Sequence, residues 1–279
     1  MHNISQQEFS SWLLSSSVLL VLIVFTTGST VFALGAQATR ALTPRQLEIE
    51  KQHQRLASVS EEERRDAVMR LGAMHLAAAS RLCLPALADQ SPIVRAVAAH
   101  AILALGPEES ASVLIPLLND NDEFVRREVA YSLGLTRSRR ATAPLSERLV
   151  SDKEDGVRAA AAIALGEVAD EAAVVVLATV LSPHPSQRKE KQKRKDERNP
   201  FVLRAIATAL GRIRSRAGVP ALLTALASEE LPGDVRREAA HALGLIGDPV
   251  AVPALRTAST AEDPYLARTA HESLRKITP

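Results

Sequence analysis

The sequence has few of the residues on which disulfide-stabilised folds, cysteine zinc sites and aromatic-rich β folds depend. Cys83 is the only cysteine among 279 residues, and aromatic residues make up 3% of the chain. One cysteine permits no intrachain disulfide and no zinc site built from cysteines. The 46% of hydrophobic residues are mainly small or aliphatic, which suits closely packed helices better than a β-sandwich. We expect Cys83 to be a buried structural residue rather than a reactive thiol.

An excess of charge of one sign is also missing. The chain has 34 Lys and Arg against 32 Asp and Glu, so its formal net charge is +2. A protein whose whole surface contacts nucleic acid usually carries a clear basic excess on its folded part. Nucleic acid is therefore not the expected partner.

Charged residues are absent between Glu8 and Arg40. The apolar run Val18–Phe25 is about as long as the core of a secretory signal peptide, and the small residues Ala36 and Ala38 would allow cleavage before Thr39. If the segment is retained, residues 12–36 are long enough to span a bilayer, and the basic residues after them would keep the rest of the chain in the cytoplasm.

Residues 1–38 are therefore expected to be a signal peptide or a membrane anchor. The small residues before Thr39 favour export to the periplasm or beyond, whereas the lack of Lys and Arg before the apolar run favours a single-pass inner-membrane anchor. In both cases the chain is expected to be directed to a membrane.

A block of about 31 residues recurs along the rest of the chain. The copies start at positions 63, 94, 125, 157, 202, 235 and 266, with spacings of 31, 31, 32, 45, 33 and 31 residues. Each copy opens an amphipathic helix, as in Val235–Ile246, and another apolar helix precedes it, as in Val219–Leu226. This pattern predicts an all-α fold, a right-handed α-solenoid of about seven helix pairs over residues 39–279, beginning near Pro44 and preceded by one hydrophobic N-terminal helix.

A glycine occupies the same late position of the second helix in five copies. These glycines are Gly72, Gly134, Gly166, Gly211 and Gly244. Glycine costs about 1 kcal/mol relative to alanine inside a helix, so we expect the next repeat to pack closely there. The last copy has Arg275 at this position, and the first copy has Glu63 at the valine position. Polar residues at these two places suit the exposed ends of a stack.

An acidic residue and an arginine recur around the valine position. They are Asp89 and Arg95, Asp120 and Arg126, Asp152 and Arg158, and Glu230 and Arg236, with Arg64 as an earlier arginine. We expect a ladder of hydrogen bonds between arginines and carboxylates that holds the loop between the two helices. A basic stripe for phosphate is the alternative, and the neighbouring carboxylates disfavour it.

The blocks Asp152–Gly166 and Glu230–Gly244, each with an acid, Val-Arg, spaced alanines and a closing Ala-Leu-Gly, resemble HEAT repeats of the bacterial phycobilisome-lyase-like class. The resemblance extends from about residue 45 to the end. It implies a helical solenoid and says little about function, because such repeats occur in scaffolds, adaptors and a few enzymes.

The 45-residue spacing marks an insertion at residues 183–200. Its central part is strongly basic and has no apolar residue, which predicts a loop. The basic residues that could contact a partner are Arg188, Lys189, Lys191, Lys193, Arg194, Lys195 and Arg198. An acidic protein, an anionic membrane surface or no partner at all are the alternatives. Nucleic acid is less favoured, because no aromatic residue interrupts the basic run.

Catalytic and metal-binding motifs give no support for an enzyme. Deoxyhypusine hydroxylases built from HEAT-like repeats bind iron through His-Glu pairs, but the corresponding positions here hold Arg127-Glu128 and Arg237-Glu238. His100 and His241 occupy equivalent positions in two repeats and are interpreted as surface or core residues. We therefore predict a non-catalytic protein-binding scaffold without cofactor, with a bilin-lyase-like or chaperone-like subunit of a protein-modifying enzyme as the alternative.

Overall fold

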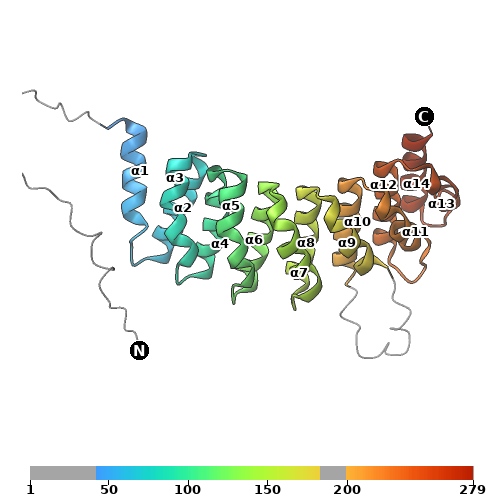
Figure 1. The fold of residues 1–279 in the computed structure, drawn as a ribbon, viewed down its shortest axis with the longest axis horizontal. Coiled ribbons are helices and arrows are strands. Elements are labelled where there is room, and N and C mark those ends of the chain that lie inside the picture. The colour runs from blue at the N-terminus through green and yellow to red at the C-terminus, as the bar shows by residue number, and fades with distance from the viewer. Residues whose placement is uncertain (1–41, 183–198, 279) are drawn as a thin grey trace, which may run out of the picture. The chain divides into compact units, whose positions relative to one another are not determined.

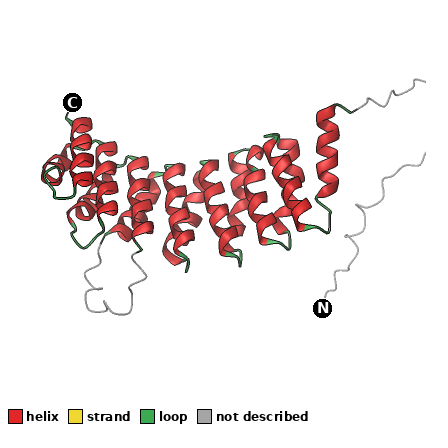
Figure 2. Ribbon diagram, turned by 180° about the vertical axis from the view of Figure 1, so that it is seen from behind, coloured by secondary structure: helices red, strands yellow, loops and turns green. Residues whose placement is uncertain are grey.

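The computed structural model describes residues 42–182 and 199–278. Figure 2 shows only helices and connecting loops in these ranges, which confirms the predicted all-α class. The expected N-terminal hydrophobic helix and most of the basic insertion lie outside the described residues. Residues Leu42–Pro279 cluster as one compact unit.

Fourteen α-helices form seven consecutive pairs in the described ranges, as predicted. The first helices are α1 (Pro44–Arg55), α3 (Ala77–Leu82), α5 (Pro107–Leu114), α7 (Thr142–Ser151), α9 (Val174–Leu181), α11 (Val219–Ala227) and α13 (Val252–Ala258). The second helices are α2 (Glu61–Ala73), α4 (Pro92–Ala101), α6 (Glu123–Thr136), α8 (Asp155–Val168), α10 (Pro200–Ile213), α12 (Gly233–Ile246) and α14 (Pro264–Ile277). Figure 1 shows the pairs side by side in chain order from α1 to α14.

Local sequence determines where these helices begin. The Thr43 side chain and Gln46 form a capping box at the start of α1, and Asp122 and Asp263 accept hydrogen bonds from the first backbone N–H groups of α6 and α14. Proline stands at the start of α4 and α10, where its missing N–H costs no helical hydrogen bond.

Alanine, valine and leucine side chains fill a continuous core between the helix pairs. The residues at the valine position are buried throughout, except for Glu63 at the exposed end of the stack. Second helices of neighbouring repeats contact one another along the whole series. Each also contacts the first helix of its own repeat, except α4, which contacts the 3-10 turn Leu84–Ala88 that follows α3. A pair alone would leave much of this apolar surface in water, so each repeat depends on its neighbours for stability.

The glycine that recurs late in the second helices lets neighbouring second helices approach closely. A Cβ atom added to Gly166 would lie 2.8 Å from the Ala209 Cα atom, and one added to Gly134 would lie 2.8 Å from the Ala164 Cα atom. The other three glycines meet the following repeat at the same position and nearly the same distance. This confirms the expected close packing, and Arg275, at the end of the stack, is exposed as predicted.

The second repeat departs from this pattern. Helix α4 ends at Ala101, and Leu103, which stands at the glycine position, belongs to a short 3-10 turn. The hydroxyl groups of Ser80 and Ser110 donate hydrogen bonds to the carbonyls of Ala101 (2.6 Å) and Ile102 (3.0 Å). These bonds satisfy carbonyl groups that a longer helix would have bonded internally.

Candidate binding surface

Three arginines of the predicted ladder form two-bond ion pairs with aspartates. Arg126 donates from Nε and Nη2 to the two carboxylate oxygens of Asp152, at 2.8 and 3.0 Å. The pair of Arg95 with Asp120 has the corresponding distances of 2.7 and 2.8 Å, and so does the pair of Arg64 with Asp89. Two parallel charge-assisted bonds fix both the distance and the orientation of each pair.

Each pair joins two successive repeats, which differs from the expected ladder within one repeat. Arg95, for example, bonds the Asp120 carboxylate of the following repeat, while its Nη1 donates to the Asp89 carbonyl of its own loop at 2.8 Å. The Arg95 guanidinium therefore bonds the interhelical loop of its own repeat and also the interhelical loop of the following repeat.

The ladder changes where the insertion interrupts the repeats. Arg158 donates to the Asp152 carbonyl at 3.1 Å and pairs with Asp155. Leu203, at the next arginine position, is buried. Arg236 bonds the Leu226 carbonyl at 3.0 Å, and Glu230 is exposed. The paired arginines of the first three repeats are largely buried and bonded to carboxylates, which agrees with the expected structural ladder.

Outward-facing side chains of α2, α4, α6, α8, α10, α12 and α14 form a surface that we call the second-helix face. Two hollows lie on it, one near each end of the series, and each is lined by three consecutive second helices. Neither hollow was predicted from the sequence.

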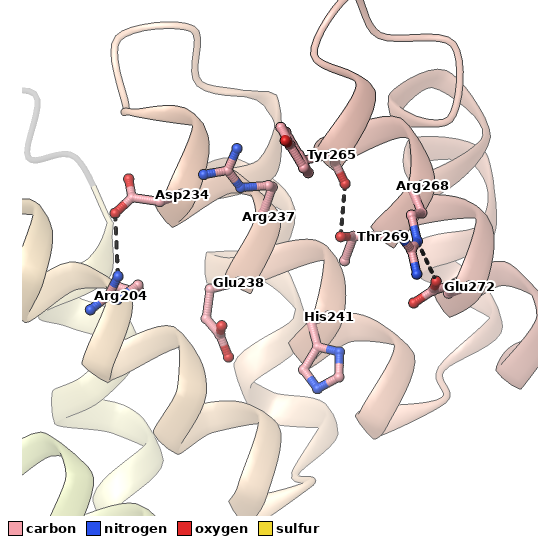
Figure 3. A pocket seen from close by; sticks show the side chains of 9 residues that line it. All are labelled: Arg204, Asp234, Arg237, Glu238, His241, Tyr265, Arg268, Thr269 and Glu272. Atoms are coloured by element: carbon pink, nitrogen blue, oxygen red, sulfur yellow. Dashed lines mark hydrogen bonds and ion pairs between the residues drawn. The ribbon is translucent and has the colours of Figure 1, made fainter.

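The charged hollow lies on α10, α12 and α14 and has a volume of about 680 Å³. Its lining residues are Arg204, Asp234, Arg237, Glu238, His241, Tyr265, Arg268, Thr269 and Glu272. Figure 3 shows Arg204 of α10 beside side chains from successive turns of α12 and α14. Three guanidinium groups face three carboxylates, so the hollow is charged but close to neutral.

Ion pairs and ring contacts hold the arginines of the charged hollow. Arg204 lies 3.7 Å from Asp234, and the Arg268 Nε donates to Glu272 at 3.0 Å (Figure 3). The Arg237 guanidinium lies 5.6 Å from the ring centre of Tyr265, within cation–π range. Tyr265 is 68% exposed. Arginine and tyrosine are residue types that often dominate binding energy at protein interfaces.

The apolar hollow lies on α2, α4 and α6 and has a volume of about 450 Å³. Its lining residues are Met69, Gly72, Ala73, His75, Ala96, Val97, His100, Ala101, Phe124 and Glu128. Met69 is 55% exposed, whereas Val97 and Phe124 are half-buried. A partly exposed thioether can adapt its shape to an apolar ligand.

Two histidines that occupy equivalent positions in different repeats line these hollows. His100 lies in the apolar hollow and His241 in the charged hollow. Their shared position was visible in the sequence, but the hollows depend on side chains from three helices and could not be derived from one repeat.

Cys83 is fully buried, as expected, and burial raises the pKa of its thiol to about 12. Within residues 42–182 and 199–278, no group of three or more His, Cys, Asp or Glu side chains is placed to hold a metal ion. His271 and Glu272 are both exposed on α14, and Glu272 pairs with Arg268.

Two sequence predictions fall on residues that the structure does not describe. The candidate partner-binding residues from Arg188 to Arg198 lie outside the described ranges, as does the whole segment 1–38. Among the described helices, none combines the length and apolar character needed to cross a bilayer.

Comparison with known proteins identifies the repeat family. The family model for HEAT repeats matches residues 49–134, 112–192 and 191–275, which together cover most of the chain. The chain belongs to the HEAT-repeat family. No curated protein matches this HEAT-repeat chain in sequence.

Several solved structures resemble this HEAT-repeat protein. The complex of CpcE and CpcF of phycocyanin lyase from Nostoc sp. is 22% identical, with 90% of this chain and 94% of that chain covered and a TM-score of 0.49. Human deoxyhypusine hydroxylase is also 22% identical, with 82% and 84% covered and a TM-score of 0.42. A designed armadillo repeat protein is 15% identical, with 82% and 99% covered and a TM-score of 0.36.

Proposed function

We propose that this HEAT-repeat protein is a non-catalytic scaffold that binds a protein partner along its second-helix face. The observation that supports the proposal most directly is the pair of hollows near the two ends of this face. Extended solenoid surfaces of this kind are suited to long protein segments.

The residue types on the face also support protein binding. Exposed Tyr265, the three arginines of the charged hollow and exposed Met69 are groups that commonly anchor interfaces. By contrast, the most nucleophilic side-chain type, represented by Cys83, is buried and protonated at neutral pH. A scaffold would bind its partner through the exposed tyrosine, arginine and methionine side chains and would not need a reactive thiol.

We further propose that the scaffold works at or beyond a bacterial membrane, directed there by residues 1–38. The uncharged apolar stretch between Glu8 and Arg40 supports this placement. The basic insertion is proposed to contact an acidic region of the partner or anionic lipid head groups, because the run from Arg188 to Arg198 has seven basic and three acidic residues.

Affinity purification of the full-length chain from native membranes tests the proposal. We expect one specific partner, which is lost when the second-helix face carries Met69→Glu with Glu238→Arg and is retained when the exposed first-helix residues carry Val175→Glu with Thr257→Glu. Replacing the seven basic residues of the insertion by Ser should weaken recovery and make it less sensitive to salt. Turnover of a small molecule by the purified chain, without any partner, would contradict the scaffold role.

A further inference from the structure

The two hollows are built from equivalent positions of different repeats. Val97 and Glu238 each lie three residues after the valine position of α4 and α12, and His100 and His241 each lie six residues after it. Both positions line the hollow of their own region. The middle helix therefore lines both hollows from the same two positions, with Val97 in one hollow and the Glu238 carboxylate in the other.

The helix that follows completes each hollow in the same way. Phe124 of α6 and Tyr265 of α14 directly precede the valine position, and both line a hollow. Glu128 and Thr269, three residues after that position, do the same. An imidazole from the middle helix and an aromatic ring from the following helix thus border both hollows.

Helix α8 lies midway between the two hollows in the series of second helices. Helix α8 has no charged side chain between Arg158 and Glu167, and its residues from Ala159 to Leu165 are alanine, isoleucine and leucine. All of these residues except Ile163 are buried, so this stretch of α8 exposes little side chain to solvent. Charged side chains on both sides, such as Arg127 and Arg204, border this stretch.

We infer that the two hollows bind two separated side chains of one extended polypeptide, and that the apolar hollow takes a large aliphatic or aromatic anchor. This inference rests on the proposed scaffold function and names the chemistry of the segment that the scaffold binds. The charged hollow takes a polar or charged side chain of the same segment, because its three carboxylates and three guanidinium groups offer partners of either sign.

The distance between the hollows favours a polypeptide over a small apolar ligand. Neighbouring packed helices lie about 8–10 Å apart, so the four repeat steps from α4 to α12 span roughly 32–40 Å. An extended chain advances about 3.3 Å per residue, and about 10–12 residues can therefore connect the two anchors. A small apolar molecule would fill the apolar hollow and leave the equivalent charged hollow unused.

The test uses the full-length chain and a displayed library of random 16-residue peptides, followed by synthesis of the selected sequences. We expect them to share a large apolar residue separated by about 10–12 residues from a polar or charged one. Met69→Glu should weaken binding at least tenfold, Met69→Leu should leave it within twofold, and Val175→Glu on α9 should not change it. Alanine in place of the peptide's apolar anchor should weaken binding to the wild type but not to Met69→Glu.

Peptides that bind equally well to the wild type and to Met69→Glu would overturn the inference while leaving the scaffold function in place. Two other occupants of the apolar hollow would give different results. A second copy of the chain would appear as a concentration-dependent dimer that Met69→Glu abolishes. An apolar small molecule would displace a fluorescent dye bound in the hollow, and no peptide would bind. Either result would also overturn the inference. Selection of no peptide, together with no partner from native membranes, would contradict the proposed function itself.

Discussion

The Arg126 guanidinium and the Asp152 carboxylate form a nearly enclosed pair that connects two repeats. The side chain of Arg126 is 7% exposed and that of Asp152 is 2% exposed, and two hydrogen bonds of 2.8 and 3.0 Å join them. Asp152 also accepts a hydrogen bond from the Glu154 backbone N–H at 3.1 Å. The ladder pair therefore fixes the start of α8 against α6.

Asp152→Ala should destabilise the fold strongly, because it leaves the enclosed Arg126 without its carboxylate. Removing one member of a buried pair costs about 3–5 kcal/mol. Glu147→Ala is the matched control, since Glu147 is 69% exposed in its pair with Arg148 and exposed pairs contribute at most about 1 kcal/mol. Urea unfolding followed by circular dichroism measures both. Equal losses for the two variants would contradict a structural ladder.

The ladder should make stability depend on pH in the acidic range. The hydrogen bonds from Arg64 lower the pKa of Asp89, with smaller contributions from the Ser91 N–H and from nearby positive charge, and together they exceed the effect of burial. Because this pKa is lower in the folded state than its unfolded value of about 3.9, the ionised carboxylate stabilises the fold above that value. Its contribution is lost as pH falls through the folded pKa.

Asp89→Asn measures this contribution. The difference in free energy of unfolding between wild type and variant should be constant from pH 7 to about 5 and should shrink below about 4. Denaturant titrations at four pH values suffice. A difference that stays the same down to pH 2 would show that Asp89 is not the titrating group.

Gly166→Ala should destabilise the stack although alanine favours helix. The added Cβ atom would lie 2.8 Å from the Ala209 Cα atom of the next repeat, and overpacking of this kind costs about 1–3 kcal/mol. Gly156→Ala on the same helix is the control, since its Cβ would meet only the Arg127 Cδ atom at 3.7 Å. The control should be neutral or stabilised by up to about 1 kcal/mol. A stabilised Gly166→Ala would contradict close helix packing.

Cys83 should react with thiol reagents only when the protein unfolds. Its side chain is fully buried, and burial raises its pKa to about 12, so almost no thiolate is available at pH 8. Labelling with a chromogenic disulfide reagent should follow the urea unfolding curve. Complete labelling within seconds in native buffer would mean that the second repeat opens readily.

Repetition made the fold predictable, because most of the seven copies carry the same few constraints. Gly166 and Gly134 indicated close helix contacts without any coordinates, and Val235–Ile246 indicated a second helix. The early end of α4 was not predictable, since Leu103 continues an apolar pattern that fits a helix as well as it fits a turn. Only the tertiary environment, with Ser80 and Ser110 bonding the last carbonyls, ends that helix.

The candidate site was harder to predict than the fold. In sequence, Asp120 is six residues from Arg126 but 25 from Arg95, yet its carboxylate bonds Arg95, because repeats stack on one another. The hollows depend on the same stacking, since His241 and Tyr265 belong to different repeats. A pattern within one repeat shows which side chains recur but not which of them meet.

Photo-crosslinking in native cells tests binding along the second-helix face most directly. A photoreactive phenylalanine analogue would replace Met69 or Thr269 on this face, and Val175 or Thr257 on first helices as controls. We predict one specific crosslinked protein from the two second-helix positions and none from the first-helix positions. Crosslinks confined to the first-helix positions, with all four variants folded, would contradict the account.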